Sequence, residues 1–226
     1  MTGLSYYIPT TSAIDWNGPR PITCNHQQCQ HINQDIFGQI ARINDHLYLC
    51  SLQALTSRRL RQKGITQVIS VMPEPIPSEI LVQVDRHIQI PVDDIDYSNL
   101  RSHFDEVGDR IAREARRGGK TAVHCMAGIS RSATIVLAYL MKYEHLSLSE
   151  AYIKVSSVRP CIQPNLGFWR QLIAYEESLY GHKTIQINDN GYLEFTFPPG
   201  TQGDQPYSQP SNMQQWSGRR SFGPRN

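Results

Sequence analysis

The sequence predicts an α/β fold in which helices flank a central, mostly parallel sheet. Short β-branched segments alternate with segments that carry apolar residues at helical spacing, between about residues 36 and 180. One helical segment, residues 135–143, is apolar on all sides, as expected of a helix at the centre of a domain. Strands that alternate with helices in this way usually form parallel sheets, because each helix carries the chain back across the sheet.

Five segments have the length and composition of β-strands. They are rich in β-branched residues, and turn-forming residues lie near their ends. Asn44 and Asp45 lie between the first two segments, so these two are expected to form a hairpin. The five segments are residues 39–43, 47–51, 66–71, 87–92 and 120–125.

Helices are expected between and after these strands. Most of them have a recognisable first or last residue. The sequence predicts helices over residues 55–63, from Ser98 to Gly118, over residues 135–143, from Ser147 to just before Pro160, and from Pro164 to residue 180. The expected capping residues are Ser98, the capping box of Ser147 and Glu150, Asn165, and the terminating glycines Gly64 and Gly181.

Charge and cysteine content exclude several classes of protein. Lys and Arg number 22 against 20 Asp and Glu, so the net charge of +2 gives no argument for DNA or a membrane surface as a partner. No apolar run approaches the roughly 20 residues that span a bilayer, and the first residues lack a secretory signal pattern. Five cysteines without regular spacing indicate free thiols in a reducing compartment. We expect a cytoplasmic or nuclear location, and mitochondrial targeting remains open.

One short segment, HCMAGISRS at residues 124–132, carries the chemistry. Cys125 ends a predicted strand, and a tight turn leads from it to a helix N-terminus. The turn amides and the helix dipole attract a phosphate dianion and favour the thiolate form of the cysteine. Gly128 allows a close backbone approach, and Arg131 is placed to bind two phosphate oxygens. Ser132 is expected to donate a hydrogen bond to the sulfur, and His124, on the other side of the strand, to orient the loop.

The plainer interpretation makes Cys125 a buried structural thiol and Arg131 a surface charge. With 7% usage assumed for each of the five defining residues, the pattern arises by chance in about four of ten thousand such chains. The strand–turn–helix context is also the one that phosphate binding beside a thiolate needs. The sequence therefore favours a functional phosphate-binding loop.

This segment resembles the HCxxGxxRS/T signature of cysteine-dependent protein phosphatases. Residues 92–104, 156–160 and 163–176 resemble the atypical dual-specificity phosphatases, in particular a small subgroup with RPxxxPNxGFWxQLxxYE. The resemblance implies a protein-tyrosine-phosphatase-like fold of the dual-specificity type, with the catalytic domain at residues 36–181. Residues 182–197 loosely resemble the C-terminal extension of that subgroup. Residues 1–35 are expected to be an extended polar arm, and residues 198–226 a disordered tail rich in Pro, Gln, Gly and Ser.

The resemblance also implies a role for each site residue. Cys125 would be the nucleophile that forms a phosphocysteine, and Asp94 the general acid, with Asp93 and Asp96 as alternatives. A solvated acidic loop is the plainer interpretation of these three aspartates. Asn165 would support the phosphate loop, or would be a plain helix N-cap; the two roles are compatible. The loop residues that would bind phosphate are Met126, Ala127, Gly128, Ile129, Ser130 and Arg131.

The implied function is hydrolysis of phosphotyrosine and phosphoserine/threonine in proteins. A domain of this length is too short for the deep pocket of the classical tyrosine phosphatases, so the pocket is expected to be shallow. The expected partners are phosphoprotein substrates and signalling kinases, and no metal or organic cofactor is expected. Two alternatives remain: a phosphoprotein-binding adaptor without turnover, and an RNA 5′-phosphatase. The loop sequence around Arg131 departs from that of the RNA enzymes, which disfavours RNA as a partner.

Three further signals are weaker. The residues Cys24, His26, Cys29 and His31 have the chemistry of zinc ligands, but one short arm would have to surround the ion, so polar arm residues are the favoured interpretation. Cys161 is expected to be a simple buried thiol, and the tail sequence SGRRS resembles both docking segments and inert tails. Basic clusters at residues 58–63 and 113–120 are interpreted as solvated helix faces rather than substrate-steering surfaces.

Overall fold

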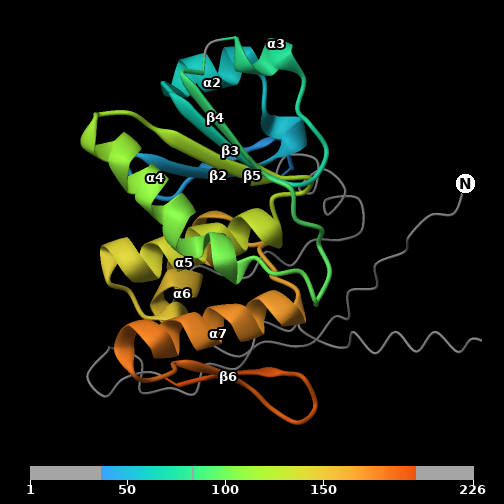
Figure 1. The fold of residues 1–226 in the computed structure, drawn as a ribbon, viewed down its shortest axis with the longest axis vertical. Coiled ribbons are helices and arrows are strands. Elements are labelled where there is room, and N and C mark those ends of the chain that lie inside the picture. The colour runs from blue at the N-terminus through green and yellow to red at the C-terminus, as the bar shows by residue number, and fades with distance from the viewer. Residues whose placement is uncertain (1–36, 83, 197–226) are drawn as a thin grey trace, which may run out of the picture. The chain divides into compact units, whose positions relative to one another are not determined.

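The computed structural model describes residues 37–82 and 84–196. Within these residues a five-stranded sheet has the order β1-β2-β5-β3-β4 (Figure 1). The strand β1 pairs antiparallel with β2, and the other pairs are parallel. The hairpin and the mostly parallel sheet predicted from the sequence are therefore confirmed. The strands are β1 (Ile40–Arg42), β2 (Leu47–Ser51), β3 (Gln67–Val71), β4 (Arg86–Ile90) and β5 (Thr121–Cys125).

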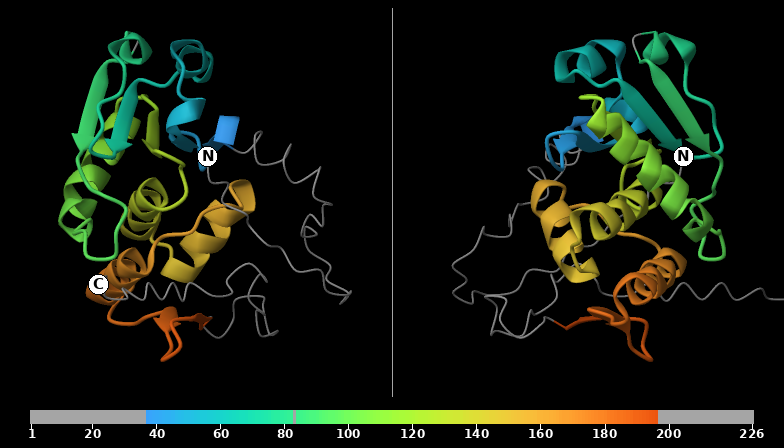
Figure 2. Two further views of the ribbon diagram at one scale, coloured as in Figure 1. Left: turned by 90° about the vertical axis from the view of Figure 1, so that its right-hand side faces the viewer. Right: turned by 60° about the vertical axis from the view of Figure 1, so that its left-hand side comes forward.

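Helices cover both faces of this sheet (Figure 2). The short helices α2 (Ser57–Lys63) and α3 (Ser78–Leu81) lie on one face. On the other face α5 packs directly on the sheet, and further helices surround α5. The helices of this second face are α4 (Phe104–Arg116), α5 (Arg131–Glu144), α6 (Leu148–Val158) and α7 (Leu166–Tyr180). None of the helices in the described part of the chain combines the length and apolar character needed to cross a bilayer.

Alternation along the strands divides the core into two halves. Tyr48, Cys50, Val68 and Ala122 pack with residues of α2, such as Leu60, in one cluster. Residues one position further along each strand point to the opposite face, towards α5. Successive residues of β5 therefore point to different halves of the core. This alternation sends His124 to the α2 side and Cys125 to the α5 side.

The helix α5 is the centre of the domain. Its residues from Arg131 through Met141 are all buried, and α4, α6 and α7 pack around it. The predicted all-apolar helix at residues 135–143 is confirmed, but the helix begins four residues earlier, at Arg131. Its N-terminus therefore lies directly after the loop that follows β5.

Most predicted helix ends are found in the structure. The capping box of Ser147 and Glu150 is present, and the Asn165 side chain accepts a hydrogen bond from the amide of Phe168. Gly64 and Gly181 both adopt left-handed conformations, with φ of 66° and 74°. The helix predicted from residue 55 begins at Ser57, because residues Leu52–Ala54 form a separate 3-10 turn.

The predicted N-cap at Ser98 is wrong. The helix α4 begins at Phe104 and follows a 3-10 turn at Arg101–His103. Ser98 lies in the preceding loop, where its amide donates to the Ile95 carbonyl at 3.1 Å. The side chain that turns the chain towards the helix is that of Asn99, whose Oδ1 accepts from the Ser102 amide at 3.2 Å.

A small hairpin after α7 is anchored to the domain by a buried carboxylate. The strands β6 (Ile185–Ile187) and β7 (Leu193–Phe195) form this hairpin below α7 in Figure 1. Glu176 is fully buried and accepts hydrogen bonds from the Leu148 amide at 2.7 Å and the Thr184 amide at 2.8 Å. The Thr184 hydroxyl donates to the same carboxylate at 2.6 Å. The Glu176 side chain of α7 thus binds both the first residue of α6 and the residue that precedes β6.

We expect Glu176→Ala to lower the free energy of unfolding by about 2–4 kcal/mol, because it leaves two buried amides without acceptors. Urea denaturation followed by circular dichroism measures this loss. The control is Glu177→Ala on the adjacent position, which removes a surface ion pair with Lys183 and is expected to cost less than about 1 kcal/mol. Equal losses in the two variants would contradict the anchoring role of Glu176.

Candidate active site

The thiol of Cys125 lies at the end of β5 and receives two hydrogen bonds. The amide of Gly128 donates to its sulfur at 3.2 Å, and the hydroxyl of Ser132 donates at 3.1 Å. Cys125 itself is only 1% exposed. Both donors place positive potential at the sulfur and so stabilise negative charge there. The hydroxyl predicted to contact the sulfur is therefore in place.

The loop after Cys125 directs its carbonyl groups away from the sulfur, and each carbonyl has a donor. The donors come from the 3-10 turn after β2, from α5, from the end of α6 and from the loop before α7. They are Leu52 N for Met126 at 3.1 Å, Arg159 Nη2 for Ala127 at 3.0 Å, Arg159 Nε for Gly128 at 2.8 Å, Gln163 N for Ile129 at 2.9 Å and Thr134 N for Ser130 at 2.9 Å. In a trans peptide the N–H points opposite to the C=O. The following amides therefore face the interior of the loop, which is the anion-binding arrangement expected from the sequence.

Gly128 is required at its position by both conformation and space. Its φ is +69°, a region that residues with a Cβ rarely adopt. A Cβ there would lie 2.4 Å from the carbonyl oxygen of Cys50 on β2. The loop can thus pack against β2 only with glycine at this position.

Arg159 is a site residue that sequence reasoning did not assign. It is 1% exposed, and its guanidinium donates to the carbonyls of Ala127 and Gly128. It follows α6 directly and reaches the loop from behind, so it fixes the loop without facing the sulfur. The segment SSVRP that contains it resembles a family motif, which by itself does not indicate what the arginine contacts. An arginine preceding a proline at the end of a helix gives no sign of its burial until the helices are packed.

Arg131 and Asp94 meet at the open side of the loop. The Nε of Arg131 lies 3.4 Å from Oδ2 of Asp94, and Nη1 donates to the Val92 carbonyl at 3.2 Å. Oδ1 of Asp94 accepts hydrogen bonds from the Ser130 hydroxyl at 2.7 Å and from Asn165 Nδ2 at 2.9 Å. Among the described residues, the buried Nε of Arg131 has no hydrogen-bond acceptor of good geometry. In this structure the anion that faces this charged donor is the Asp94 carboxylate.

Of the three candidate aspartates, Asp94 is the one whose side chain contacts the loop and Asn165. Asp93 and Asp96 are exposed, and within the described residues the structure gives neither side chain a hydrogen bond to the loop. Asn165 has both roles considered for it, because it caps α7 and contacts Asp94. The assignment of Asp94 as the acid stays a prediction.

His124 points to the opposite side of the sheet, into a short polar chain. Its Nε2 is 2.6 Å from the Ser70 hydroxyl, which is 2.8 Å from Nε2 of His87. Its Nδ1 lies 3.3 Å from the carbonyl oxygen of Cys125. Burial lowers the pKa of His124 to about 4, so the imidazole is neutral near pH 7. A neutral ring with Nδ1–H donating to the Cys125 carbonyl supplies the sixth donor to the loop.

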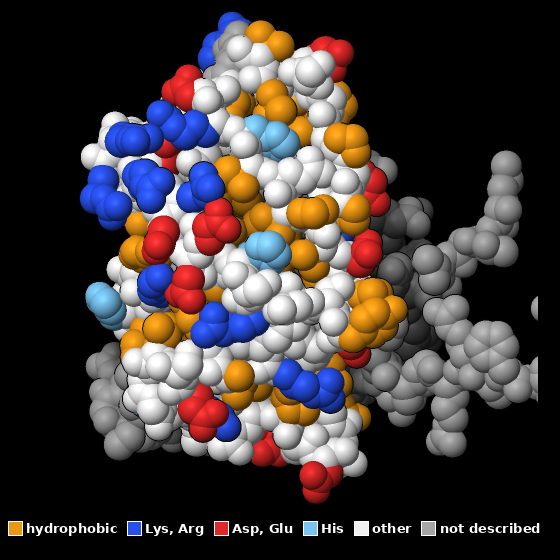
Figure 3. Space-filling view, viewed as in Figure 1, with side chains coloured by type: hydrophobic (Ala, Val, Ile, Leu, Met, Phe, Trp, Pro, Cys, Tyr) orange, Lys and Arg blue, Asp and Glu red, His pale blue; other side chains and the backbone are white. Residues whose placement is uncertain are grey.

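The basic cluster near the end of α4 lies away from this site. Figure 3 shows Lys and Arg side chains gathered over the C-terminal end of α4, where Arg113, Arg116 and Arg117 are exposed. This end leads into the first residue of β5, whereas Cys125 is the last residue of that strand. Four residue steps of about 3.3 Å separate the two ends. The cluster is thus not part of the loop that contains Cys125.

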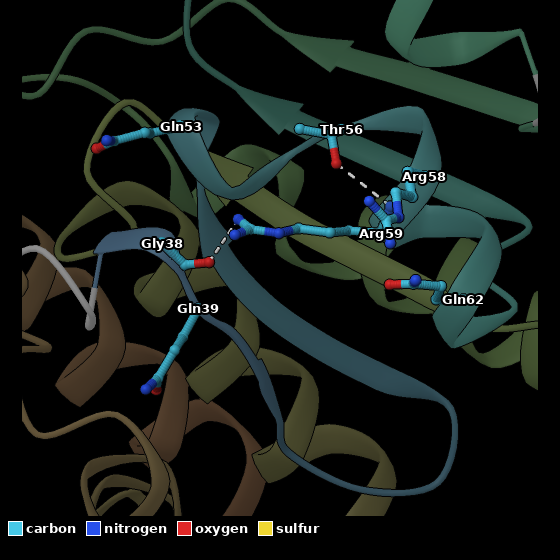
Figure 4. Close-up of a pocket in the computed structure, with 7 residues that line it drawn as sticks. All are labelled: Gly38, Gln39, Gln53, Thr56, Arg58, Arg59 and Gln62. Atoms are coloured by element: carbon cyan, nitrogen blue, oxygen red, sulfur yellow. Dashed lines mark hydrogen bonds between the residues drawn. The ribbon is translucent and has the colours of Figure 1, made fainter.

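The second basic cluster borders a hollow beside α2 (Figure 4). Arg59 uses its guanidinium there to bind the carbonyl of Gly38 at 2.7 Å and that of Ala54 at 3.4 Å, which ties the start of the described chain to α2. The hollow is lined by Gly38, Gln39, Gln53, Thr56, Arg58, Arg59 and Gln62.

The remaining weak signals of the sequence are only partly described by the structure. Cys161 is partly buried, and burial raises the pKa of its thiol. The Cys24–His31 cluster and the tail sequence SGRRS lie outside the described residues.

Comparisons with known proteins agree on one family. The family described as "Dual specificity phosphatase, catalytic domain" matches residues 47–178. Dual specificity protein phosphatase 14 of Mus musculus is 42% identical over 162 residues, covering 71% of this chain and 81% of that protein. Dual specificity protein phosphatase 18 of Mus musculus is 40% identical, covering 67% and 80%. The crystal structure of human DUSP28 has a TM-score of 0.58 at 33% identity, covering 62% of this chain and 94% of that chain.

The fold and the cysteine loop at the N-terminus of α5 define a cysteine-based protein phosphatase. Within that class the chain belongs to the dual-specificity phosphatases. The predicted family, fold and enzyme type are confirmed.

We expect Arg159→Lys to lower kcat by about 10- to 100-fold, because a lysine cannot hold two neighbouring carbonyls and the loop then shifts. Phosphate release from a small aryl phosphate measures the effect. The control is Arg113→Lys, at an exposed arginine near the far end of β5, which is expected to leave kcat unchanged. Full activity of Arg159→Lys would show that the loop does not depend on this side chain.

Proposed function

We propose that this chain hydrolyses phosphotyrosine and phosphoserine/threonine in proteins through a phosphocysteine intermediate. The observation that carries the proposal is the Cys125 sulfur with its two donors, the Gly128 amide and the Ser132 hydroxyl, in a loop that ends at Arg131, whose guanidinium pairs with Asp94. The catalytic domain would comprise residues 36–181, with residues 182–197 as its extension. We further propose a cytoplasmic or nuclear location and signalling kinases among its partners.

In the first step the Cys125 thiolate attacks phosphorus. An S–P bond forms while the bond from phosphorus to the tyrosine, serine or threonine oxygen breaks. The amides of residues 126–131 and the Arg131 guanidinium bind the three equatorial oxygens, where negative charge accumulates. Asp94, protonated at this stage, gives its proton to the leaving oxygen. The protein leaves as an alcohol or phenol.

In the second step a water molecule attacks the phosphocysteine. Asp94, now a carboxylate, takes the proton from this water, and the S–P bond breaks to release inorganic phosphate. The Ser132 hydroxyl, 3.1 Å from the sulfur, stabilises the thiolate as it leaves. His124 acts on the loop rather than on the substrate, because its ring lies on the other side of the sheet.

The surroundings of the site favour a protein substrate. Met126 follows Cys125 directly and is 47% exposed, and Ile95 and Tyr97, close to Asp94 in sequence, are 37% and 87% exposed. Apolar side chains that border a phosphate site can pack against the apolar part of a phosphorylated peptide. The adaptor alternative is disfavoured because nucleophile, arginine, hydroxyl and candidate acid are all present. The RNA alternative is disfavoured because the loop sequence around Arg131 departs from that of the RNA enzymes.

Matched phosphotyrosine and phosphothreonine peptides test the proposed reaction. We expect both to release phosphate with the native protein, and Cys125→Ser to reduce turnover by at least about 10⁴-fold, because the hydroxyl is a far weaker nucleophile near pH 7. The ratio of kcat/KM for the two peptides reports how shallow the pocket is. Binding of both peptides without turnover by either protein would establish the adaptor alternative instead.

Asp94→Asn should lower kcat/KM for an alkyl or phenyl phosphate by about 100-fold, because the leaving oxygen then lacks its proton donor. Steady-state kinetics of the native chain and of Asp94→Asn measure this effect. If kcat/KM is unchanged in Asp94→Asn, the acid is another group, with Asp93→Asn and Asp96→Asn as the next variants.

A further inference from the structure

We propose that helix α7 holds the general acid in its working position, and that Gln171 and Gly167 are positioning residues for protonation of the leaving group. The proposal rests on the function proposed above, with Asp94 as the acid. The segment that carries Asp94, residues 92–101, is called the acid loop below.

The acid loop has little structure of its own to hold it in place. Asp93, Asp94, Ile95, Asp96 and Tyr97 form an unbroken exposed run. The backbone hydrogen bonds from Val92 to Ile90 and from Ser98 to Ile95 are short-range and close only small turns. Apart from Leu100, whose side chain is fully buried, the acid loop has few buried contacts, so it is held largely by the groups that bind it from outside.

Gln171 binds the C-terminal part of the acid loop with both ends of its amide. Its Oε1 accepts from the amides of Leu100 at 2.9 Å and Arg101 at 2.7 Å. Its Nε2 donates to the Ser98 carbonyl at 2.8 Å. Three backbone groups are thus satisfied by one side chain, which fixes the position and orientation of this part of the loop.

Gly167 allows the same helix to approach the middle of the loop. A Cβ at this position would lie 1.7 Å from the carbonyl oxygen of Asp96 and 2.6 Å from its Cα. Any side chain here would therefore push the backbone two residues after Asp94 away from α7. The contact requires glycine for its space, because the φ of Gly167 is not in the left-handed region.

The start of α7 also holds the phosphate loop, so one element positions both reacting groups. Asn165 donates to Asp94 through Nδ2, and its amide donates to the Ser130 hydroxyl at 3.1 Å. Gln163, two residues earlier, donates to the Ile129 carbonyl. Further along α7, the ring of Tyr175 lies under the guanidinium of Arg101, and 4.1 Å separate the ring centre from the Cζ atom of Arg101. The separation between acid and nucleophile is therefore set by α7 rather than by the chain that joins them.

Loss of this support should affect the transfer of the proton more than the attack by sulfur. The leaving oxygen of phenyl phosphate needs the proton, whereas the acidic phenol of 4-nitrophenyl phosphate leaves largely without it. The ratio of kcat/KM for phenyl phosphate to that for 4-nitrophenyl phosphate therefore measures the acid. This ratio does not depend on the fraction of folded enzyme, because both rates scale with it.

The experiment compares Gln171→Met with the native chain and with Gln186→Met, the same change at an exposed position of β6. We expect Gln171→Met to lower the ratio by about 3- to 10-fold, in the direction of Asp94→Asn, and Gln186→Met to leave it unchanged. Gln171→Glu keeps the acceptor for Leu100 and Arg101 but sets a carboxylate oxygen against the Ser98 carbonyl, so a decrease is expected here too. It replaces Gln171→Met if that variant does not fold.

An unchanged ratio in Gln171→Met, or in Gln171→Glu where that variant replaces it, would overturn the proposal, even if both rates fall together. Failure of the proposed function looks different. Without Cys125-dependent turnover in the native chain there is no reaction to position, and an unchanged ratio in Asp94→Asn removes Asp94 as the acid. The first result overturns both inferences. The second leaves the hydrolysis in place but removes Asp94 as the acid and, with it, the positioning role of Gln171. A change in Asp94→Asn alone overturns only the role of Gln171.

Discussion

The arrangement of the site depends on one constraint, which is that six successive carbonyl groups must point away from the sulfur. A loop whose amides face inward has its carbonyls facing outward, and a buried carbonyl without a donor costs about 1–3 kcal/mol. The donors come from Leu52, Arg159 and Gln163, which are distant from the loop in the sequence, and from His124 and Thr134, which lie on either side of it. The anion-binding loop therefore exists only when these parts have assembled around it.

Several elements that are distant in the sequence supply or orient the donors for these carbonyl groups. The 3-10 turn after β2 delivers the Leu52 amide, and the end of α6 delivers the Arg159 guanidinium. The polar chain of Ser70 and His87 lies on the far side of the sheet, yet it fixes the ring of His124 and through it the Cys125 carbonyl. Burial keeps that ring neutral, since the pKa of His124 falls to about 4, so it adds no positive charge behind the loop.

The sequence predicted most of the fold and the contiguous part of the site. Strands, the central helix and the caps at Ser147 and Asn165 depend on local composition and spacing, which a sequence displays directly. Arg159 was not predicted, because its role depends on how α6 packs. The failed cap at Ser98 has a related cause: the preceding loop is shaped by Gln171, more than seventy residues later, and local propensity cannot reveal such a partner. For the hairpin at residues 185–195 the sequence shows only a weak resemblance to a family extension, because its strands are just three residues long.

The dependence on contacts between distant residues also explains why the nucleophile and the acid need a third element that binds both of their loops. Cys125 and Asp94 are separated by a helix and a strand, and neither segment could fix their distance if the acid loop moved freely. The residues that bind both loops lie within nine positions, from Gln163 in the segment before α7 to Gln171 in α7 itself, and α7 packs on α5. A rigid helix transmits position over that length without distortion, whereas two independent loops would not. The geometry of the reaction is thus carried by α7, although both proposed catalytic groups lie elsewhere.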